Sequence, residues 1–288
     1  MASTDGKGPG RGVRPCAVAG LFYPADPARA RAEVEALLTA ADSRGGGSVD
    51  HRDVPRRGSA PKALIVPHAG WRYSGDLAAL GWRTLVPLRG TVSRVVLLGP
   101  THRVAVRGLA LPDADHVDSP LGPLRVPVDE VLSRTAHLPT PVRVHAATHR
   151  DEHALEVHFP FIHRVLGQVQ VIPLNVGVAD PADVADVIEE LWGGNESVIA
   201  VSSDLSHHLS DRQAQVVDAE TITRVLDRQD VESGRACGAS PLNGLLEVCR
   251  RRDLHPRLLG AHNSSTVNGD VGRVVGYATF AVQEKARP

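Results

Sequence analysis

The sequence predicts an α/β protein, a single domain with a largely parallel central sheet and helices on both faces. Two observations predict this class. Short apolar runs alternate along the chain with segments of helical periodicity, which is the pattern of strands joined by crossover helices. The apolar runs are also continuous rather than alternating, as expected for strands that are buried on both faces of a sheet.

Five apolar runs are the predicted strands. Each is short and rich in Val, Ile or Leu, and the last lies near the end of the chain, where it could form an antiparallel edge. The runs cover residues 63–66, 95–98, 169–174, 198–201 and 274–282.

Five further segments are predicted helices because apolar side chains recur at i, i+3, i+4 and i+7 or because their pattern is otherwise helical. The first begins at Asp26 and Pro27, where an N-cap residue is followed by proline at the first helical position. Its apolar positions extend to Ala41. The others cover residues 76–87, 184–191, 212–229 and 242–249.

The domain organisation follows from length and local composition. The 288 residues suit one large domain or two small ones, and we expect a single domain that spans residues 13–284. Residues 1–12 are polar and rich in glycine, which predicts a disordered tail. Residues 44–60 mix Gly, Ser, Arg and Pro with almost nothing to bury, which predicts a mobile surface loop.

Composition excludes several classes of protein. The formal net charge is −1, from 32 basic and 33 acidic residues, so bulk charge favours neither nucleic acid nor a membrane surface as partner. No apolar stretch approaches the ~18 residues that span a bilayer. The N-terminus lacks the apolar core of a secretory signal. Three widely spaced cysteines form no disulfide framework. We therefore expect a cytoplasmic protein.

Polar side chains follow several predicted strands. His68 in "VPHAGW" and His102 in "GPTHR" come just after two of them, and Asp204 and His207 follow a third in "SSDLSHH". Asn175 follows a fourth in "VIPLNVG". A single histidine after a strand is more often a loop or packing residue. In open α/β sheets, however, ligands bind outside the carboxyl ends of the strands, so the repeated pattern predicts one shared polar or metal site.

These residue types suit a metal centre. Neutral imidazole is the commonest metal ligand near pH 7. Two histidines with a carboxylate or thiolate leave positions open on iron, zinc or copper. A histidine beside a carboxylate, such as His207 near Asp204, can also act as a general base. His208 is interpreted as structural.

Two other candidates have weaker signals. His153 and Glu156 are spaced i, i+3 in "HALEVHFPF", which fits one face of a helical turn but is not the metalloprotease spacing, and a capping turn explains it equally well. Cys237 precedes the helix that opens at Pro241, where a thiol can gain thiolate character. Simple burial is the commoner fate of a free cysteine.

Six longer motifs follow one another along the chain: "RPCAVAGLFYPADP", "VPHAGWRYSG", "LLGPTHR", "EHALEVHFPFI", "SSDLSHH" and "SSTVNGDVGRVVGYATFAV". In this order they resemble the motifs of the Memo family, whose bacterial members are called AmmeMemoRadiSam system protein B. The resemblance covers about residues 13–282. It implies a fold similar to the class III extradiol, LigB-like, non-haem iron dioxygenases.

The resemblance also implies a site. His68, His102 and Cys237 correspond to the family's metal ligands, for iron or copper, and Asp204 and His207 line the same pocket. His207, oriented by Asp204, is the expected acid/base residue, and His153 is a further catalytic candidate. A thiolate in place of the glutamate ligand of the dioxygenases makes a softer, oxidisable site. Ring-cleaving activity therefore does not transfer with the fold.

Three functions remain open from the sequence. The first is a mononuclear iron- or copper-dependent oxidoreductase. The second is a non-catalytic module that binds a peptide or partner on a degenerate dioxygenase scaffold. The third is a zinc hydrolase that uses the same residues with a metal-activated water. The resemblance further implies a radical SAM protein and an AMMECR-type domain protein as partners, because bacterial members are encoded beside them.

Overall fold

Four parallel strands form the centre of the sheet, in the order β8, β3, β9, β2. All four correspond to predicted apolar runs, and every residue in them beyond the first position is buried. The computed structural model describes residues 10–44 and 60–284. The four strands are β2 (Ala63–Val66), β3 (Arg94–Pro100), β8 (Gln170–Val176) and β9 (Ser197–Ser202).

An antiparallel ribbon extends the sheet beyond β2. The closing strand β12 (Val274–Glu284) pairs antiparallel with β2 and with β11 (Leu254–Asn263). The short strand β10 (His207–Leu209) also pairs with β12. The closing run is therefore antiparallel, as expected, but it is not an edge strand, because β11 pairs with one side of it and β2 and β10 pair with the other.

On the other side of β8 the sheet continues through short strands. Within the described ranges, the sheet has twelve strands in all and is mixed, with a parallel centre. The remaining strands are β1 (Val13–Arg14), β4 (Leu109–Leu111), β5 (His116–Val117), β6 (Leu124–Arg125) and β7 (Arg143–Val144).

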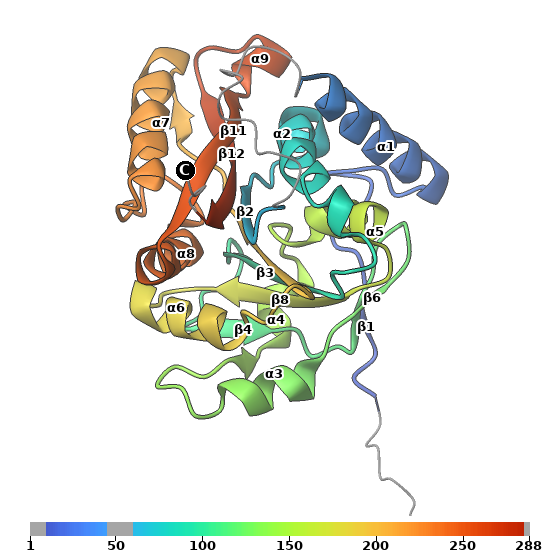
Figure 1. The fold of residues 1–288 in the computed structure, drawn as a ribbon. Coiled ribbons are helices and arrows are strands. Elements are labelled where there is room, and N and C mark those ends of the chain that lie inside the picture. Colours follow the sequence, from blue (N-terminus) through green and yellow to red (C-terminus); the bar gives the residue numbers. More distant parts are fainter. Residues whose placement is uncertain (1–9, 45–59, 285–288) are drawn as a thin grey trace, which may run out of the picture.

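Helices cover both faces of the sheet, as predicted (Figure 1). On one face α2 packs against β2 and β12, and α1 and α5 pack on α2. On the other face α8 packs against β3 and β9, with α6 and α7 beside the sheet. Their bounds are α1 (Pro27–Arg44), α2 (Trp71–Arg83), α5 (Phe159–Leu166), α6 (Pro181–Glu190), α7 (Asp211–Leu226) and α8 (Ala239–Arg252).

Shorter helices complete the connections. They are α3 (Val128–Thr135), α4 (Ala146–Arg150), α9 (Ser265–Asn268) and the 3-10 turns η1 (Val86–Leu88) and η2 (Glu156–His158). All five predicted helices occur. The helix predicted at 76–87 begins five residues earlier, at Trp71, because its apolar face starts with that buried indole.

Two predictions concern residues that the structure leaves undescribed. Most of the predicted tail, residues 1–9, and most of the predicted loop, residues 45–59, lie outside the described ranges. Among the residues that are described, no helix has the length and apolarity to cross a membrane.

Candidate metal centre

Three histidines from three different segments meet at the carboxyl ends of the central strands. His68 lies two residues after β2, His102 two residues after β3, and His153 in the loop between α4 and η2. One ligand nitrogen from each lies within 4.8 Å of the other two, and in the described part of the chain this is the one histidine, cysteine or carboxylate group close enough to share an ion. The predicted convergence of strand ends is thus found for His68 and His102, and His153 joins them.

The spacing of the three rings suits a single transition-metal ion. The His102 and His153 rings are stacked, with centroids 4.6 Å apart, and both meet the His68 ring edge-on at 5.2 and 5.4 Å. Imidazole nitrogens bind such ions at ~2.0–2.1 Å, so two ligands of one ion lie within ~4 Å of each other. The 4.8 Å limit on the distances between the three nitrogens is close to that value.

Glu152 orients two of these rings. Its Oε1 lies 2.9 Å from Nδ1 of His102 and 3.2 Å from Nδ1 of His153, and its carboxylate also accepts the backbone N–H groups of His102, His153 and Ala154. Since Nδ1 of each ring contacts the carboxylate, Nε2 is the ring nitrogen left to bind an ion. This carboxylate–histidine arrangement is common around metal ligands, where it fixes ring orientation and raises basicity.

His68 is held differently. It is almost completely buried, and its Nδ1 lies 2.7 Å from Oγ of Ser202 at the end of β9. Its backbone N–H donates to Oδ1 of Asp204 at 2.8 Å. Its Nε2 faces the centre and lies 3.2 Å from Sγ of Cys237. Every one of the three histidines therefore presents Nε2.

Electrostatics keep the donors in the forms that bind metal. Burial lowers the pKa of His68 well below its usual value, helped by the nearby His153 and His102, so its ring is neutral at pH 7. Burial alone would raise the pKa of Glu152, but hydrogen bonds from His102 and His153 lower it overall. A neutral imidazole group beside a fixed carboxylate is the arrangement that cation binding requires.

Cys237 lies beside the three-histidine group on the loop before α8. The Asp204 N–H donates to its Sγ at 3.3 Å, and its own N–H donates to the carbonyl oxygen of Asp204 at 3.3 Å. The end of β9 therefore fixes the position of the thiol. Burial raises the pKa of Cys237, and the Asp204 carboxylate adds to that shift, so the metal-free form is the thiol.

Asp204 lies close to the histidine group, and His207 lies near Asp204 without a hydrogen bond between the two side chains. Asp204 is buried, which raises its pKa, and its Oδ1 accepts from His68. His207 has Nδ1 2.8 Å from the Leu205 carbonyl oxygen, so that backbone contact orients the ring rather than Asp204. His208 is exposed and has φ 64°, which fits its structural interpretation.

Two residues flagged by the sequence lie away from the centre. Glu156 is buried, but it accepts from Arg14, from the backbone of Ala17 and Val18, and from the Tyr23 hydroxyl, so it is a structural anchor. Asn175, at the end of β8, donates from Nδ2 to the Thr148 carbonyl oxygen at 2.8 Å. It holds α4 in place and thereby the loop that carries Glu152 and His153.

Sequence reasoning missed Glu152 and the part played by Ser202. Glu152 immediately precedes His153 in "DEHALEVH", and the adjacent acidic residue and histidine were the available signal. Ser202 stands in the "SSDLSHH" motif, but a serine there also fits a simple strand end. Only the folded arrangement shows which hydroxyl contacts a ring nitrogen.

A cavity of about 670 Å³ adjoins the centre, and both His102 and Cys237 line it. Its walls are largely small and apolar, and none of the lining residues is acidic. The volume is in the range of small-molecule sites, roughly 300–1,000 Å³. The lining residues nearest in sequence to His102 are Pro100, Thr101, Arg103 and Val104.

A three-histidine centre at the carboxyl ends of parallel strands defines an α/β protein with a site that could hold a metal ion. Comparison with known proteins gives the family: the chain matches the Memo-like protein family over residues 14–281 and belongs to it. A MEMO1 family protein of Sulfolobus acidocaldarius is 30% identical over 284 residues, which cover 92% of this chain and 97% of that protein. One from Thermotoga maritima is 30% identical over 282 residues, covering 91% and 96%.

Proposed function

We propose that this chain binds one iron or copper ion at the three-histidine group and uses it for redox chemistry on a small molecule in the adjoining cavity. The observation that carries the proposal is the common orientation of the rings. Each Nδ1 contacts Glu152 or Ser202, which leaves each Nε2 available, and one ring nitrogen of each histidine lies within 4.8 Å of the other two. A set of soft and borderline donors beside Cys237 favours iron, copper or zinc over magnesium or calcium.

Two ligand sets compete within this proposal. The family resemblance implies His68, His102 and Cys237, whereas the side-chain distances favour His68, His102 and His153. Cys237 Sγ lies 3.2 Å from Nε2 of His68, so the thiolate is the natural fourth ligand once its proton is lost. When bound, iron or copper would supply one-electron chemistry that no side chain can supply.

His207 is the proposed acid/base residue, and its atoms have defined roles. A carbonyl oxygen only accepts, so Nδ1 of His207 carries the hydrogen that faces Leu205. Nε2 of the neutral ring is then free to take up a proton. Asp204 contributes through its charge rather than through a hydrogen bond. Its carboxylate lies near His207, as well as near His153 and His102, and its negative charge would stabilise the protonated His207 ring.

Metal analysis tests the proposal. The protein is purified without chelator from cells supplied with iron, copper and zinc, and bound metal is measured by mass spectrometry and by competition with a chelator. We expect about one ion per chain, with loss of binding in the His68→Ala, His102→Ala double variant. Binding that survives this double variant would place the ion elsewhere.

A second pair of variants separates the ligand sets. His153→Gln and Cys237→Ser are loaded with copper(II), and absorption and affinity are compared. A thiolate ligand gives a charge-transfer band that Cys237→Ser abolishes. If only His153→Gln weakens binding and no such band exists, the ligands are the three histidines.

A zinc hydrolase is the second candidate, and the three-imidazole donor set favours it. Three histidines with one open position are the ligand set that zinc uses to activate water. His102 is the most exposed of the three, so solvent can reach the centre. Zinc as the ion retained after purification, with no redox response to oxygen or ascorbate, would select this function.

The third candidate, a binding module, is tested together with the proposed partners. Those partners are a radical SAM protein and an AMMECR-type domain protein of the same organism. We expect them to co-purify with the chain, and the metal-site variants decide between the functions. Partner binding lost in His68→Ala would mean that the pocket itself is the docking site.

A further inference from the structure

A chain of buried hydrogen bonds runs from the core to Nδ1 of His68, the best-buried of the three proposed ligands. It begins at Trp82 on α2, whose Nε1 lies 3.2 Å from Nδ1 of His158. Nε2 of His158 lies 3.0 Å from Oγ of Ser202, which in turn lies 2.7 Å from Nδ1 of His68. Trp82, His158 and Ser202 all have a relative exposure of 0%.

The hydrogens in this chain can be assigned from chemistry alone. An indole N–H only donates, so Nδ1 of His158 accepts and carries no hydrogen. The hydrogen of the His158 ring is therefore on Nε2, and it is donated to Ser202. Ser202 Oγ also lies 2.7 Å from the Ala154 carbonyl oxygen. Because a carbonyl only accepts, the single hydroxyl hydrogen of Ser202 points there.

The direction of the Ser202 hydroxyl decides which tautomer His68 adopts. Since the Ser202 hydrogen is already used, Ser202 can only accept from His68, and the hydrogen of that ring must be on Nδ1. The Ser202 oxygen is then fully satisfied, with one hydrogen donated and two accepted. Nε2 of His68 then carries the lone pair of the ring, and it lies 3.2 Å from Cys237 Sγ, a weak hydrogen-bond donor that a metal ion could replace.

We propose that Trp82, His158 and Ser202 are positioning residues that hold His68 in its Nδ1-protonated tautomer, ready to ligate through Nε2. The role in metal binding rests on the proposed function, but the tautomer itself does not. The design differs from that around His102 and His153, where a carboxylate sets the tautomer. For His68 a neutral hydrogen-bond chain, which starts at an indole that cannot reverse its direction, does so instead.

The metal-free wild-type protein gives the first test. Histidine labelled with ¹⁵N is examined by NMR correlations that distinguish a hydrogen on Nδ1 from one on Nε2, and the two signals are assigned by their loss in His68→Gln and His158→Gln. We expect the hydrogen on Nδ1 in His68 and on Nε2 in His158. The opposite tautomer in either ring, or a rapidly averaged mixture, would overturn the proposal.

A matched pair of variants gives the second test. Trp82→Phe removes the donor that starts the chain, whereas Trp71→Phe removes a similar buried indole donor that instead bonds the Val157 carbonyl oxygen at 3.0 Å. We expect Trp82→Phe to alter the His158 and His68 NMR signals and to weaken Zn²⁺ binding about 10-fold, the lower range for groups behind a metal ligand. Trp71→Phe should change neither.

The two readouts separate this proposal from the proposed function. If the wild-type protein binds no Zn²⁺, iron or copper, the metal function fails, while the tautomers measured in the metal-free protein still decide the present inference. Thermal unfolding checks that both variants fold. Equal effects of the two tryptophan variants on the His68 signal would show general loosening of the core and would overturn the directed chain.

Discussion

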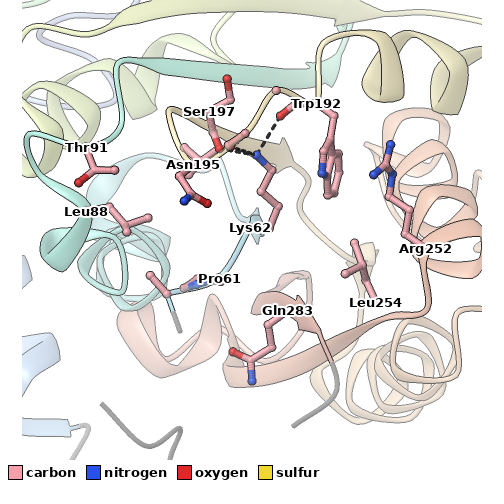
Figure 2. Close-up of a pocket in the computed structure, with 14 residues that line it drawn as sticks. Pro61, Lys62, Leu88, Thr91, Trp192, Asn195, Ser197, Arg252, Leu254 and Gln283 are labelled. Carbon is pink, nitrogen blue, oxygen red and sulfur yellow. Dashed lines mark hydrogen bonds between the residues drawn. The ribbon is translucent and has the colours of Figure 1, made fainter. Parts of the chain in front are cut away.

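The cavity around Lys62, shown in Figure 2, lies at the amino ends of β2 and β9, whereas the three-histidine group lies near the carboxyl ends of the same strands. The Lys62 cavity is slightly larger, at about 720 Å³ against about 670 Å³ beside the histidines. The ammonium group of Lys62 in this cavity nevertheless has a hydrogen-bond partner for each of its hydrogens. Lys62 Nζ donates to the carbonyl oxygens of Trp192, Gly194 and Ser197 at 2.8, 2.6 and 2.7 Å.

An ammonium group has three hydrogens, so Lys62 has none left for a ligand. Its Nζ and the Arg252 guanidinium also lie 5.2 and 4.8 Å from the Trp192 ring. The histidine group differs: each Nδ1 contacts a carboxylate or hydroxyl oxygen, whereas Nε2 of His68 faces only the Cys237 sulfur, a weak hydrogen-bond partner. The candidate site therefore differs from the Lys62 cavity in its ring nitrogens that could still bind a ligand, not in its volume.

The largest expected effect comes from Glu152→Gln. An amide in place of the carboxylate puts an N–H group against the backbone and ring N–H groups that Glu152 now accepts. Because Glu152 orients two of three rings, we expect metal affinity to fall about 100-fold, the upper range for such groups. Chelator competition measures the affinity, and circular dichroism checks the fold.

The matched control is Glu196→Gln at the opposite end of the sheet. This carboxylate also accepts a backbone N–H, from Gly194, but it is exposed. Metal affinity should stay at the wild-type value. A loss similar to that of Glu152→Gln would mean that affinity reports overall stability and would remove the distinction between the two ends.

Lys62→Met should have the opposite effect to Glu152→Gln, because it should lower the stability of the protein without changing its metal affinity. Three carbonyl oxygens lose their partner, and at a net ~0.5–1.5 kcal/mol for each hydrogen bond the free energy of unfolding should fall by about 2 kcal/mol. Metal affinity should not change. Urea unfolding of the metal-free protein and chelator competition are the two measurements. A variant of wild-type stability would contradict the structural role of Lys62.

A smaller effect concerns pH and His149, which lies outside the three-histidine group. Burial lowers its pKa from 6.5 to about 4, and its Nε2 lies 2.8 Å from the Ala110 carbonyl oxygen. Between these pH values the unfolded chain takes up a proton that the folded ring does not. The free energy of unfolding should therefore decrease as pH falls from 6.5 towards 4, by about 1.4 kcal/mol per pH unit from this residue.

His149→Gln removes that titration and keeps a donor for Ala110. The pH slope of the unfolding free energy, measured in urea without metal, should become shallower by about one proton. An unchanged slope would show that His149 is protonated in the folded protein. Measurements above pH 7, where both states leave His149 neutral, should give equal slopes for the two proteins.

The parallel centre of the fold could be predicted because short, continuous apolar runs are typical of strands that are buried on both faces. The strand β11 could not be predicted in this way. Its segment, "LHPRLLGAHN", contains proline and glycine and has no clean alternation, and it is a strand because β12 pairs with it along most of its length. The same pairing places β12 inside the sheet. Local sequence carries little information about which long-range partner a strand finds.

The residues of the candidate site also fall into those that the sequence predicts and those that it does not. His68 and His102 could be predicted because each directly follows a buried strand. His153 and Glu152 lie on a loop whose position depends on contacts far away in sequence, such as Asn175 with Thr148. The spacing of His153 and Glu156 suggested one shared face, but the two residues have separate surroundings. Loop residues are placed by tertiary hydrogen bonds that no periodicity encodes.

The contacts of Glu156 have a consequence for how the chain can be shortened. They bind the segment from Arg14 to Tyr23 to the loop that carries His153, and the Phe22 ring packs 4.7 Å from the His153 ring. The opening stretch of the domain therefore forms one wall beside the three-histidine group. A deletion that stops before Val13 spares this wall, whereas one that extends past Tyr23 removes it although every proposed ligand is still present.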